Sequence, residues 1–231
     1  MREWIAFWNS ANSIYVNARH RDVHYRKLAE DLRAYIAGPT AVVLDYGCGE
    51  ALHADRIAAA AGRLILCDAA PAVRAALSAR FAGQPKIEVR APDEVDTMAD
   101  ASLDLVLIVS VAQYLAADEL DRLLALFRRR LRPGGRLLLG DVVPPSISPL
   151  TDALALIRFA ASHGFLLAAI GGLLRTAFSD YRKLRRTVGI TVHEPRAMLA
   201  RLSAAGFAAV RADKNIGHNA ARMTFVATRP G

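Results

Sequence analysis

The chain has 231 residues, enough to bury most of the apolar surface of one domain. Its content of 53% hydrophobic and 23% charged residues excludes a disordered or low-complexity chain. The net charge of +8 favours anionic partners, but only four basic residues are lysines, so an arginine-rich coding bias explains the charge at least as well.

Residues 1–38 read as an N-terminal helical cap of one or two helices. Its apolar anchors are Trp4, Phe7, Trp8, Ile14 and Tyr15. No aliphatic run with a cleavage site follows Met1, so we expect no secretory signal. The two cysteines, Cys48 and Cys67, are too few for a disulfide framework and favour a reducing compartment. We therefore expect a cytoplasmic protein.

From residue 41 onward, apolar runs alternate with segments of helical period. The run Leu105-Val106-Leu107-Ile108-Val109 is aliphatic throughout, which indicates a strand buried on both faces. Over residues 39–231 this alternation predicts a doubly wound α/β fold, in which helices cover both faces of a mostly parallel seven-stranded sheet. The expected strands are 41–46, 63–67, 86–90, 104–109, 136–140, 207–211 and 223–228, and the expected helices are 51–61, 71–81, 118–131 and 194–205.

Residues 144–190 interrupt this alternation between the fifth and sixth expected strands. They begin with two prolines and continue into an apolar helical stretch, in which Gly164, Gly171 and Gly172 favour a bend. Long insertions in compact domains are usually functional, so we expect a helical lid, a dimer surface or a membrane contact. The longest uncharged run has about 16 residues, short of the roughly 20 that a bilayer-spanning helix needs.

A buried strand that ends in Asp45 leads into Gly47-Cys48-Gly49 and then a helix. Glycines here let the backbone turn sharply and let a ligand approach, at the strand ends where open parallel sheets bind ligands. Leu52 stands where a dinucleotide fingerprint needs glycine or alanine, which counts against a NAD-dependent oxidoreductase. Asp45 favours a ligand with an ammonium group over a pyrophosphate.

The stretch Asp45-Tyr46-Gly47-Cys48-Gly49 resembles motif I of the class I S-adenosylmethionine-dependent methyltransferases. The likeness extends over roughly residues 41–141. Residues 64–68 resemble the second strand, residues 102–106 the start of the fourth, and residues 131–137 the turn into the fifth. The resemblance implies a Rossmann-like methyltransferase whose cofactor is S-adenosylmethionine.

The resemblance also implies the residues that contact the cofactor. Asp68 lies about twenty residues beyond the glycines, at the place of the family's ribose-binding acid. The adenine-binding acid of many members is replaced by Ala91, and Asp93 is its nearest substitute. Leading helices of this family fold over the cofactor. The expected contacts are therefore Tyr15, Arg19, Tyr25, Asp45, Gly47, Cys48, Gly49, Asp68, Ala69, Ala91, Asp93 and Ser110.

Methyl transfer chiefly needs alignment of donor and acceptor, so no universal catalytic residue is expected. After the fourth strand, Gln113 and Tyr114 stand where members that act on small molecules and lipids often carry polar or aromatic residues. Asp141 faces the acceptor or is a solvated acid at a strand end. His24 is a candidate general base. His20 and His24 lie four residues apart, but no third metal ligand stands out, so a solvated helix face is favoured and no metal is expected.

These observations predict transfer of a methyl group to a small hydrophobic acceptor, such as a lipid, quinone-like or polyketide-like compound. The alternatives are an RNA methyltransferase, suggested only by charge, and a non-catalytic S-adenosylmethionine-binding protein. No DNA partner is expected, and a monomer and a dimer both stay open. The apolar insertion, followed by Arg182, Lys183, Arg185 and Arg186, suits either a packed lid or a weak contact with the inner face of a membrane.

Overall fold

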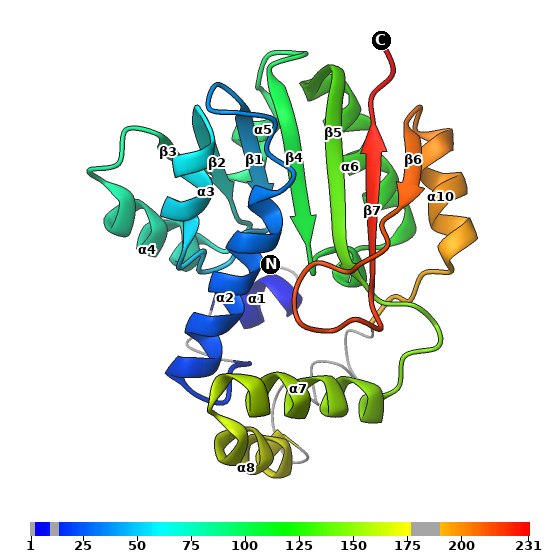
Figure 1. The fold of residues 1–231 in the computed structure, drawn as a ribbon. Coiled ribbons are helices and arrows are strands. Elements are labelled where there is room, and N and C mark those ends of the chain that lie inside the picture. Colours follow the sequence, from blue (N-terminus) through cyan, green and yellow to red (C-terminus); the bar gives the residue numbers. More distant parts are fainter. Residues whose placement is uncertain (1–2, 10–13, 177–189) are drawn as a thin grey trace.

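The computed structural model describes residues 3–9, 14–176 and 190–231. A seven-stranded sheet in the order β3-β2-β1-β4-β5-β7-β6 forms its centre (Figure 1). Strands β1 to β5 are parallel, and β7 runs antiparallel to its neighbours β5 and β6. This confirms the predicted α/β fold. The strands are β1 (Val42–Tyr46), β2 (Arg63–Cys67), β3 (Ile87–Arg90), β4 (Leu103–Val109), β5 (Leu131–Val142), β6 (Ala208–Arg211) and β7 (Met223–Thr228).

Helices cover both faces because successive strand residues point to opposite sides of the sheet. Val43 and Leu105 pack in one core with α2, α3 and α4, whereas Leu44 and Val106 pack in a second core with α6 and α10. The aliphatic strands are therefore buried on both faces, as predicted. The helices are α2 (Ala18–Arg33), α3 (Ala54–Ala60), α4 (Pro71–Phe81), α5 (Pro92–Asp96), α6 (Ala117–Arg130) and α10 (Pro195–Ala204).

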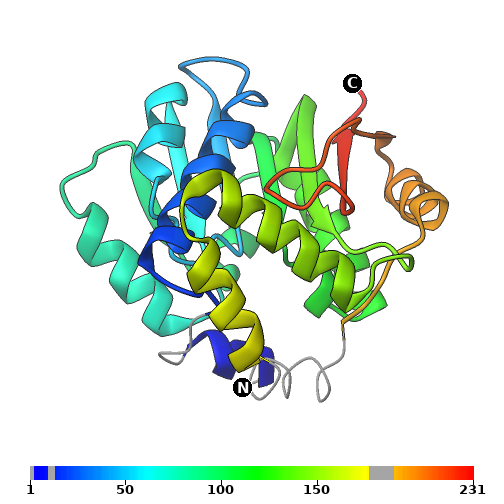
Figure 2. The same cartoon turned by 60° about the horizontal axis from the view of Figure 1, so that its bottom comes forward.

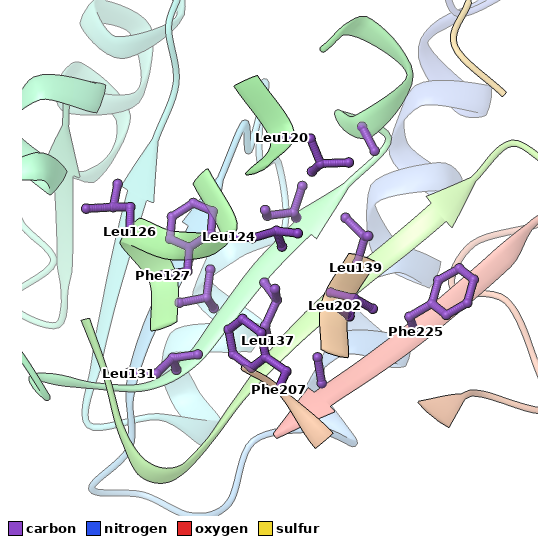
Figure 3. Packing of buried hydrophobic residues seen from close by; sticks show 14 of the residues in the cluster. Leu120, Leu124, Leu126, Phe127, Leu131, Leu137, Leu139, Leu202, Phe207 and Phe225 are labelled. Carbon is purple, nitrogen blue, oxygen red and sulfur yellow. The ribbon is translucent and has the colours of Figure 1, made fainter. Parts of the chain in front are cut away.

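Helix α6 shows how the sequence forms this second core. Leu120, Leu124 and Phe127 recur at helical spacing and are at most 1% exposed, so one apolar stripe faces the sheet (Figure 3). Acidic residues in its first turn and arginines in its last turn complement the helix dipole.

The expected start of the fifth strand at residue 136 was wrong. Leu131 already pairs with Leu103 of β4, and the N–H of Gly134 donates to the carbonyl oxygen of Arg229. The turn segment therefore joins β5, and α6 ends at Arg130.

Three further helices, α1 (Glu3–Trp8), α7 (Pro149–His163) and α8 (Leu166–Thr176), gather with α2 at the carboxyl end of the parallel strands (Figures 1 and 2). Val23 of α2 packs in one cluster with Phe159, Phe165 and Ala169 of the α7–α8 segment. None of the described helices is long and apolar enough to cross a membrane.

The bend between α7 and α8 falls at Gly164, which ends α7 with a φ of 73° in the left-handed region. The expected bend at Gly171 and Gly172 was wrong, because α8 runs through both. A Cβ on Gly172 would lie 2.3 Å from Cγ1 of Val16, so this glycine lets α8 approach the chain before α2.

Candidate functional site

A cavity of about 1710 Å³ lies at the carboxyl ends of the parallel strands. The segments after β1, β2, β4 and β5 line it, together with α1, α2, α7, α8 and the loop between β6 and β7. Open parallel sheets bind ligands at this edge. Most of the residues predicted from the sequence line this cavity: Tyr15, His24, Tyr25, Asp45, Gly47, Cys48, Gly49, Asp68, Ala69, Ser110, Gln113, Tyr114 and Asp141.

The loop after β1 turns through Gly47 and Gly49, whose φ angles of 77° and 58° lie in the left-handed region. The N–H groups of Gly47 and Cys48 donate to the carbonyl oxygen of Cys67 at 2.7 and 3.1 Å, which ties this glycine loop to the end of β2. A Cβ on Gly47 would lie 2.4 Å from Cγ2 of Val111. Both conformation and space therefore require glycine at this position, and the segment after β4 packs directly on the turn.

Two carboxylates flank the glycine loop. Asp68 accepts hydrogen bonds from the N–H of Gly49 at 3.0 Å and from the N–H of Ala70 at 2.8 Å, which fixes its orientation. Asp45 is 7% exposed, and burial, followed by the nearby charge of Asp68, raises its pKa to about 7. Burial also raises the pKa of Asp68, against the lowering effect of its hydrogen bonds. A cation beside a buried carboxyl such as Asp45 favours the charged form of that carboxyl.

Helix α2 closes over the glycine loop through Tyr25, whose hydroxyl accepts a hydrogen bond from the N–H of Glu50 at 3.0 Å. The rings of Tyr15 and Tyr25 are 5.8 Å apart, and burial raises the pKa of Tyr25 to about 12, so its hydroxyl stays protonated. Arg19 does not line the cavity. Its Nε donates to the carbonyl oxygen of His163 at 2.5 Å, so it connects α2 to α7 instead.

The residues expected to contact adenine are placed differently from the prediction. Neither Ala91 nor Asp93 lines the cavity, whereas Pro92 and Asp96 of α5 do. The N–H of Ala91 is used within α5, where it donates to Oε2 of Glu94 at 2.6 Å. Asp96 follows Asp93 by three residues, about one helical turn, so the helix presents a later acid to the cavity than sequence matching indicated.

Ser110 directly follows β4 and Asp141 is the second-last residue of the neighbouring β5, and both have left-handed φ angles, 59° and 58°. Such backbone strain in residues other than glycine is concentrated at functional sites. Oγ of Ser110 donates to Oδ2 of Asp141 at 2.6 Å, and Nη1 of Arg222 lies 2.6 Å from the same oxygen. The Asp141 side chain is 15% exposed, so the interpretation of a solvated acid at a strand end was wrong.

The predicted solvated face of α2 was also wrong. His20 is 6% exposed, and its ring stacks on Phe165 at a centroid distance of 5.0 Å. His24 lines the cavity, and burial, followed by the charges of His218, His20 and Arg222, lowers its pKa to about 3. His24 is therefore uncharged near neutral pH. The described residues contain no group of three or more acids, histidines or cysteines that could hold a metal.

The short helix η1 (Ala112–Tyr114) brings Gln113 and Tyr114 to the cavity. Gln113 is 5% exposed, and within the described chain its Oε1 atom has no hydrogen-bond partner. Tyr114 contacts two aromatic rings of α1, those of Trp4 at a centroid distance of 6.2 Å and Trp8 at 6.4 Å.

Among the cavity residues that sequence reasoning missed is a connected polar group near Asp141. Asp152 belongs to α7, and His218, Asn219 and Arg222 belong to the loop between β6 and β7. Arg222 reaches Asp152 as well as Asp141, and Nδ2 of Asn219 donates to Oδ1 of Asp152 at 2.7 Å. The only sequence signal was the polar cluster between the last two expected strands, and it carried no recognisable spacing.

A model of the methyltransferase-domain family matches residues 43–135. This stretch of the chain therefore resembles a methyltransferase domain. The matched range includes the glycine loop, Asp68 and η1, whereas α1, α2, α7, α8 and the loop before β7 lie outside it.

Solved structures show the same fold. A chain from the complex between the Haloferax volcanii Trm112 methyltransferase activator and the putative methyltransferase is 15% identical, with a TM-score of 0.63 and full coverage of both chains. The DhpI-SAH complex is 18% identical, with a TM-score of 0.61, and the match covers 98% of this chain and 95% of that one. Magnesium protoporphyrin IX methyltransferase from Synechocystis PCC 6803 with bound SAH is 16% identical, with a TM-score of 0.60 and coverage of 98% and 92%. No curated protein matches the sequence.

Proposed function

We propose that this protein is a methyltransferase that binds S-adenosylmethionine over β1 and β2 and methylates a small, hydrophobic acceptor held over β4 and β5. The observation that carries the proposal is a pair of acids, the buried Asp45 and the partly buried Asp68, beside one glycine loop in one cavity. A carboxylate such as Asp68 suits the hydroxyls of a ribose because it accepts hydrogen bonds. Asp45 suits the ammonium of an amino-acid group, since a cation offsets the cost of its burial.

The cofactor supplies an electrophilic methyl group when it is bound, so the chain mainly aligns the acceptor. Ser110, Gln113 and Asp141 offer polar atoms on the acceptor side. With a pKa of about 3, His24 is a weak base near neutral pH, and we assign it a hydrogen-bonding role.

The helical segments outside the sheet fit a cap and a lid. We assign residues 1–38 to a cap, because Tyr25 of α2 lies on the glycine loop. We assign residues 144–190 to a lid, because Pro149, Ala153 and Leu156 of α7 and Leu173 of α8 line the cavity. These apolar side chains would exclude water and favour a hydrophobic acceptor. The RNA alternative is supported only by net charge.

Calorimetry with S-adenosylhomocysteine, the demethylated cofactor, tests the cofactor site. We expect micromolar affinity, equivalent to about 8 kcal/mol. Asp68→Ala should weaken binding by about 1–3 kcal/mol, since buried hydroxyls lose their partner. Asp93→Ala is the matched control, because Asp93 is exposed and does not line the cavity, and its affinity should stay within about twofold. Absence of binding by the wild type, or tight binding of NAD instead, would refute the proposal.

We further propose a weak contact between the α7–α8 lid and an anionic membrane surface. Leu150 on α7 and Leu167 and Leu174 on α8 are 68%, 86% and 69% exposed. The lid's one acid within residues 149–176, Asp152, points inward to Arg222, whereas Arg158 is exposed. The lid therefore directs its acid inward and a basic side chain outward, and this arrangement favours an anionic surface. The basic residues Arg182, Lys183, Arg185 and Arg186 lie outside the described residues.

Cosedimentation with phosphatidylcholine vesicles, with and without phosphatidylserine, tests this contact. We expect more protein on the anionic vesicles, less at high salt, and loss of binding in the double variant Leu167→Glu/Leu174→Glu. Val210→Glu is the control, because Val210 is equally exposed but lies on β6. No binding to either vesicle would refute the contact, and concentration-dependent dimers that the double variant abolishes would assign the surface to a second copy.

A further inference from the structure

Two residues that line the cavity, Gln113 and Trp4, each have one buried polar atom without a partner among the described residues. Oε1 of Gln113 is a hydrogen-bond acceptor, and Nε1 of Trp4 is a donor, and neither has a partner among the described residues. Both side chains line the cavity, and the Trp4 ring lies 6.2 Å from the ring of Tyr114, the residue after Gln113. A buried group without a partner costs about 1–3 kcal/mol, so such atoms need a ligand or a bound water.

The Trp4 ring belongs to an aromatic group with Trp8 and with Tyr114, the residue after Gln113. The planes of Trp4 and Tyr114 differ by 20°, and Trp8 meets Tyr114 edge-on at 75°. All three rings line the cavity. Flat conjugated ligands gain both burial and ring–ring contact against walls of this kind.

The segment that carries Gln113 and Tyr114 also packs against the glycine loop. Val111, two residues before Gln113, packs on Gly47, because a Cβ there would lie 2.4 Å from Cγ2 of Val111. In the sheet, β4 lies directly beside β1, with Leu107 paired to Asp45. Gln113 therefore lies shortly after β4, and β4 is the neighbour of β1, the strand that leads into the glycine loop.

We infer that Gln113, Tyr114, Trp4 and Trp8 form the acceptor subsite, and that it takes an uncharged planar aromatic compound carrying a hydroxyl or amine donor and an oxygen acceptor. The inference rests on the proposed function, since it treats this part of the cavity as the acceptor side. The donor of the ligand binds Oε1 of Gln113, and its oxygen accepts from Nε1 of Trp4. An acid is disfavoured because the aromatic walls would remove water from its charged carboxylate.

The test uses full-length protein saturated with S-adenosylhomocysteine and three probes: 4-hydroxyacetophenone, acetophenone and 4-hydroxybenzoate. The first two differ by one hydroxyl, the donor that Gln113 needs. We expect calorimetry to show that acetophenone, which lacks this hydroxyl, binds the wild type about 5- to 150-fold more weakly than 4-hydroxyacetophenone. This is the range for leaving a buried atom such as Oε1 of Gln113 unpaired. In Gln113→Leu this ratio should fall below about threefold, whereas Gln84→Leu, at an exposed glutamine outside the cavity, should keep the wild-type ratio. We expect 4-hydroxybenzoate, which keeps the hydroxyl but adds a charge, to bind more weakly than 4-hydroxyacetophenone.

The two tryptophans, the only ones in the chain, give a second readout. The indole N–H signal of Trp4, assigned with Trp4→Phe, should move on titration with 4-hydroxyacetophenone. An unchanged probe ratio in Gln113→Leu, or an indole signal that no probe moves, would overturn the subsite and leave the cofactor site intact. Failure of the wild type to bind S-adenosylhomocysteine would instead refute the proposed function itself.

Discussion

Gly47→Ala tests how the glycine loop is held open for the cofactor. The φ of 77° costs a residue with a side chain about 1–2 kcal/mol. The new Cβ would also lie 2.4 Å from Cγ2 of Val111, and forcing an extra methyl into a packed site costs about 1–3 kcal/mol. Val111 is β-branched and has few alternative rotamers. We therefore expect the free energy of unfolding to fall by about 2–5 kcal/mol.

Gly134→Ala is the matched control, because Gly134 has the same φ of 77° but no atom within 4 Å of its added Cβ. Gly134→Ala should lower the free energy of unfolding only by the cost of the left-handed φ, about 1–2 kcal/mol. Both substitutions restrict the unfolded chain alike, so their difference isolates the contact with Val111. Urea unfolding measures the free energies, and calorimetry with S-adenosylhomocysteine should show weaker binding for Gly47→Ala alone.

A second variant separates the contact from the conformation. Val111→Ala removes the methyl groups that the new Cβ would meet, so the double variant Gly47→Ala/Val111→Ala should be more stable than the sum of the two single losses predicts. Equal losses for Gly47→Ala and Gly134→Ala, or strict additivity in the double variant, would refute the argument.

Two further predictions concern charged groups. Because burial raises the pKa of Asp45 to about 7, cofactor binding at pH 6 should release a proton as the ammonium favours the charged carboxylate. The calorimetric heat should then depend on the buffer's ionisation enthalpy, affinity should rise from pH 5 to pH 8, and Asp45→Asn should abolish both effects. Without the cofactor, the contribution of Asp45 to stability should be lost as pH rises from about 4 to about 7, because the folded state disfavours its charge. Arg222→Met should lower the free energy of unfolding by about 3 kcal/mol, because it breaks ion pairs with the largely buried Asp141 and Asp152. Arg122→Met is its control, since the exposed Arg122–Asp118 pair should change stability by less than about 1 kcal/mol, and equal losses would contradict the assignment.

The sequence by itself determined the sheet and the cofactor loop. Aliphatic runs predict buried parallel strands, and the observed strands fall on the predicted runs. The glycine loop could be found because its requirement is local: Gly47 and Gly49 need left-handed φ angles within one turn of chain. Asp68 could be found because it directly follows the very next strand, β2, and accepts a hydrogen bond from the N–H of Gly49.

Only the tertiary structure decided the acceptor side. Trp4 and Tyr114 are 110 residues apart in the sequence, and Arg222 meets Asp141 across 81 residues. The burial of His20 likewise depends on the α7–α8 lid, because the sequence of a helix does not show which distant segment covers each of its faces. Hydrophobic periodicity indicates only on which face of its own helix or strand a side chain lies. The partner that it meets depends on how distant elements pack, because those contacts form only when the loops between them close.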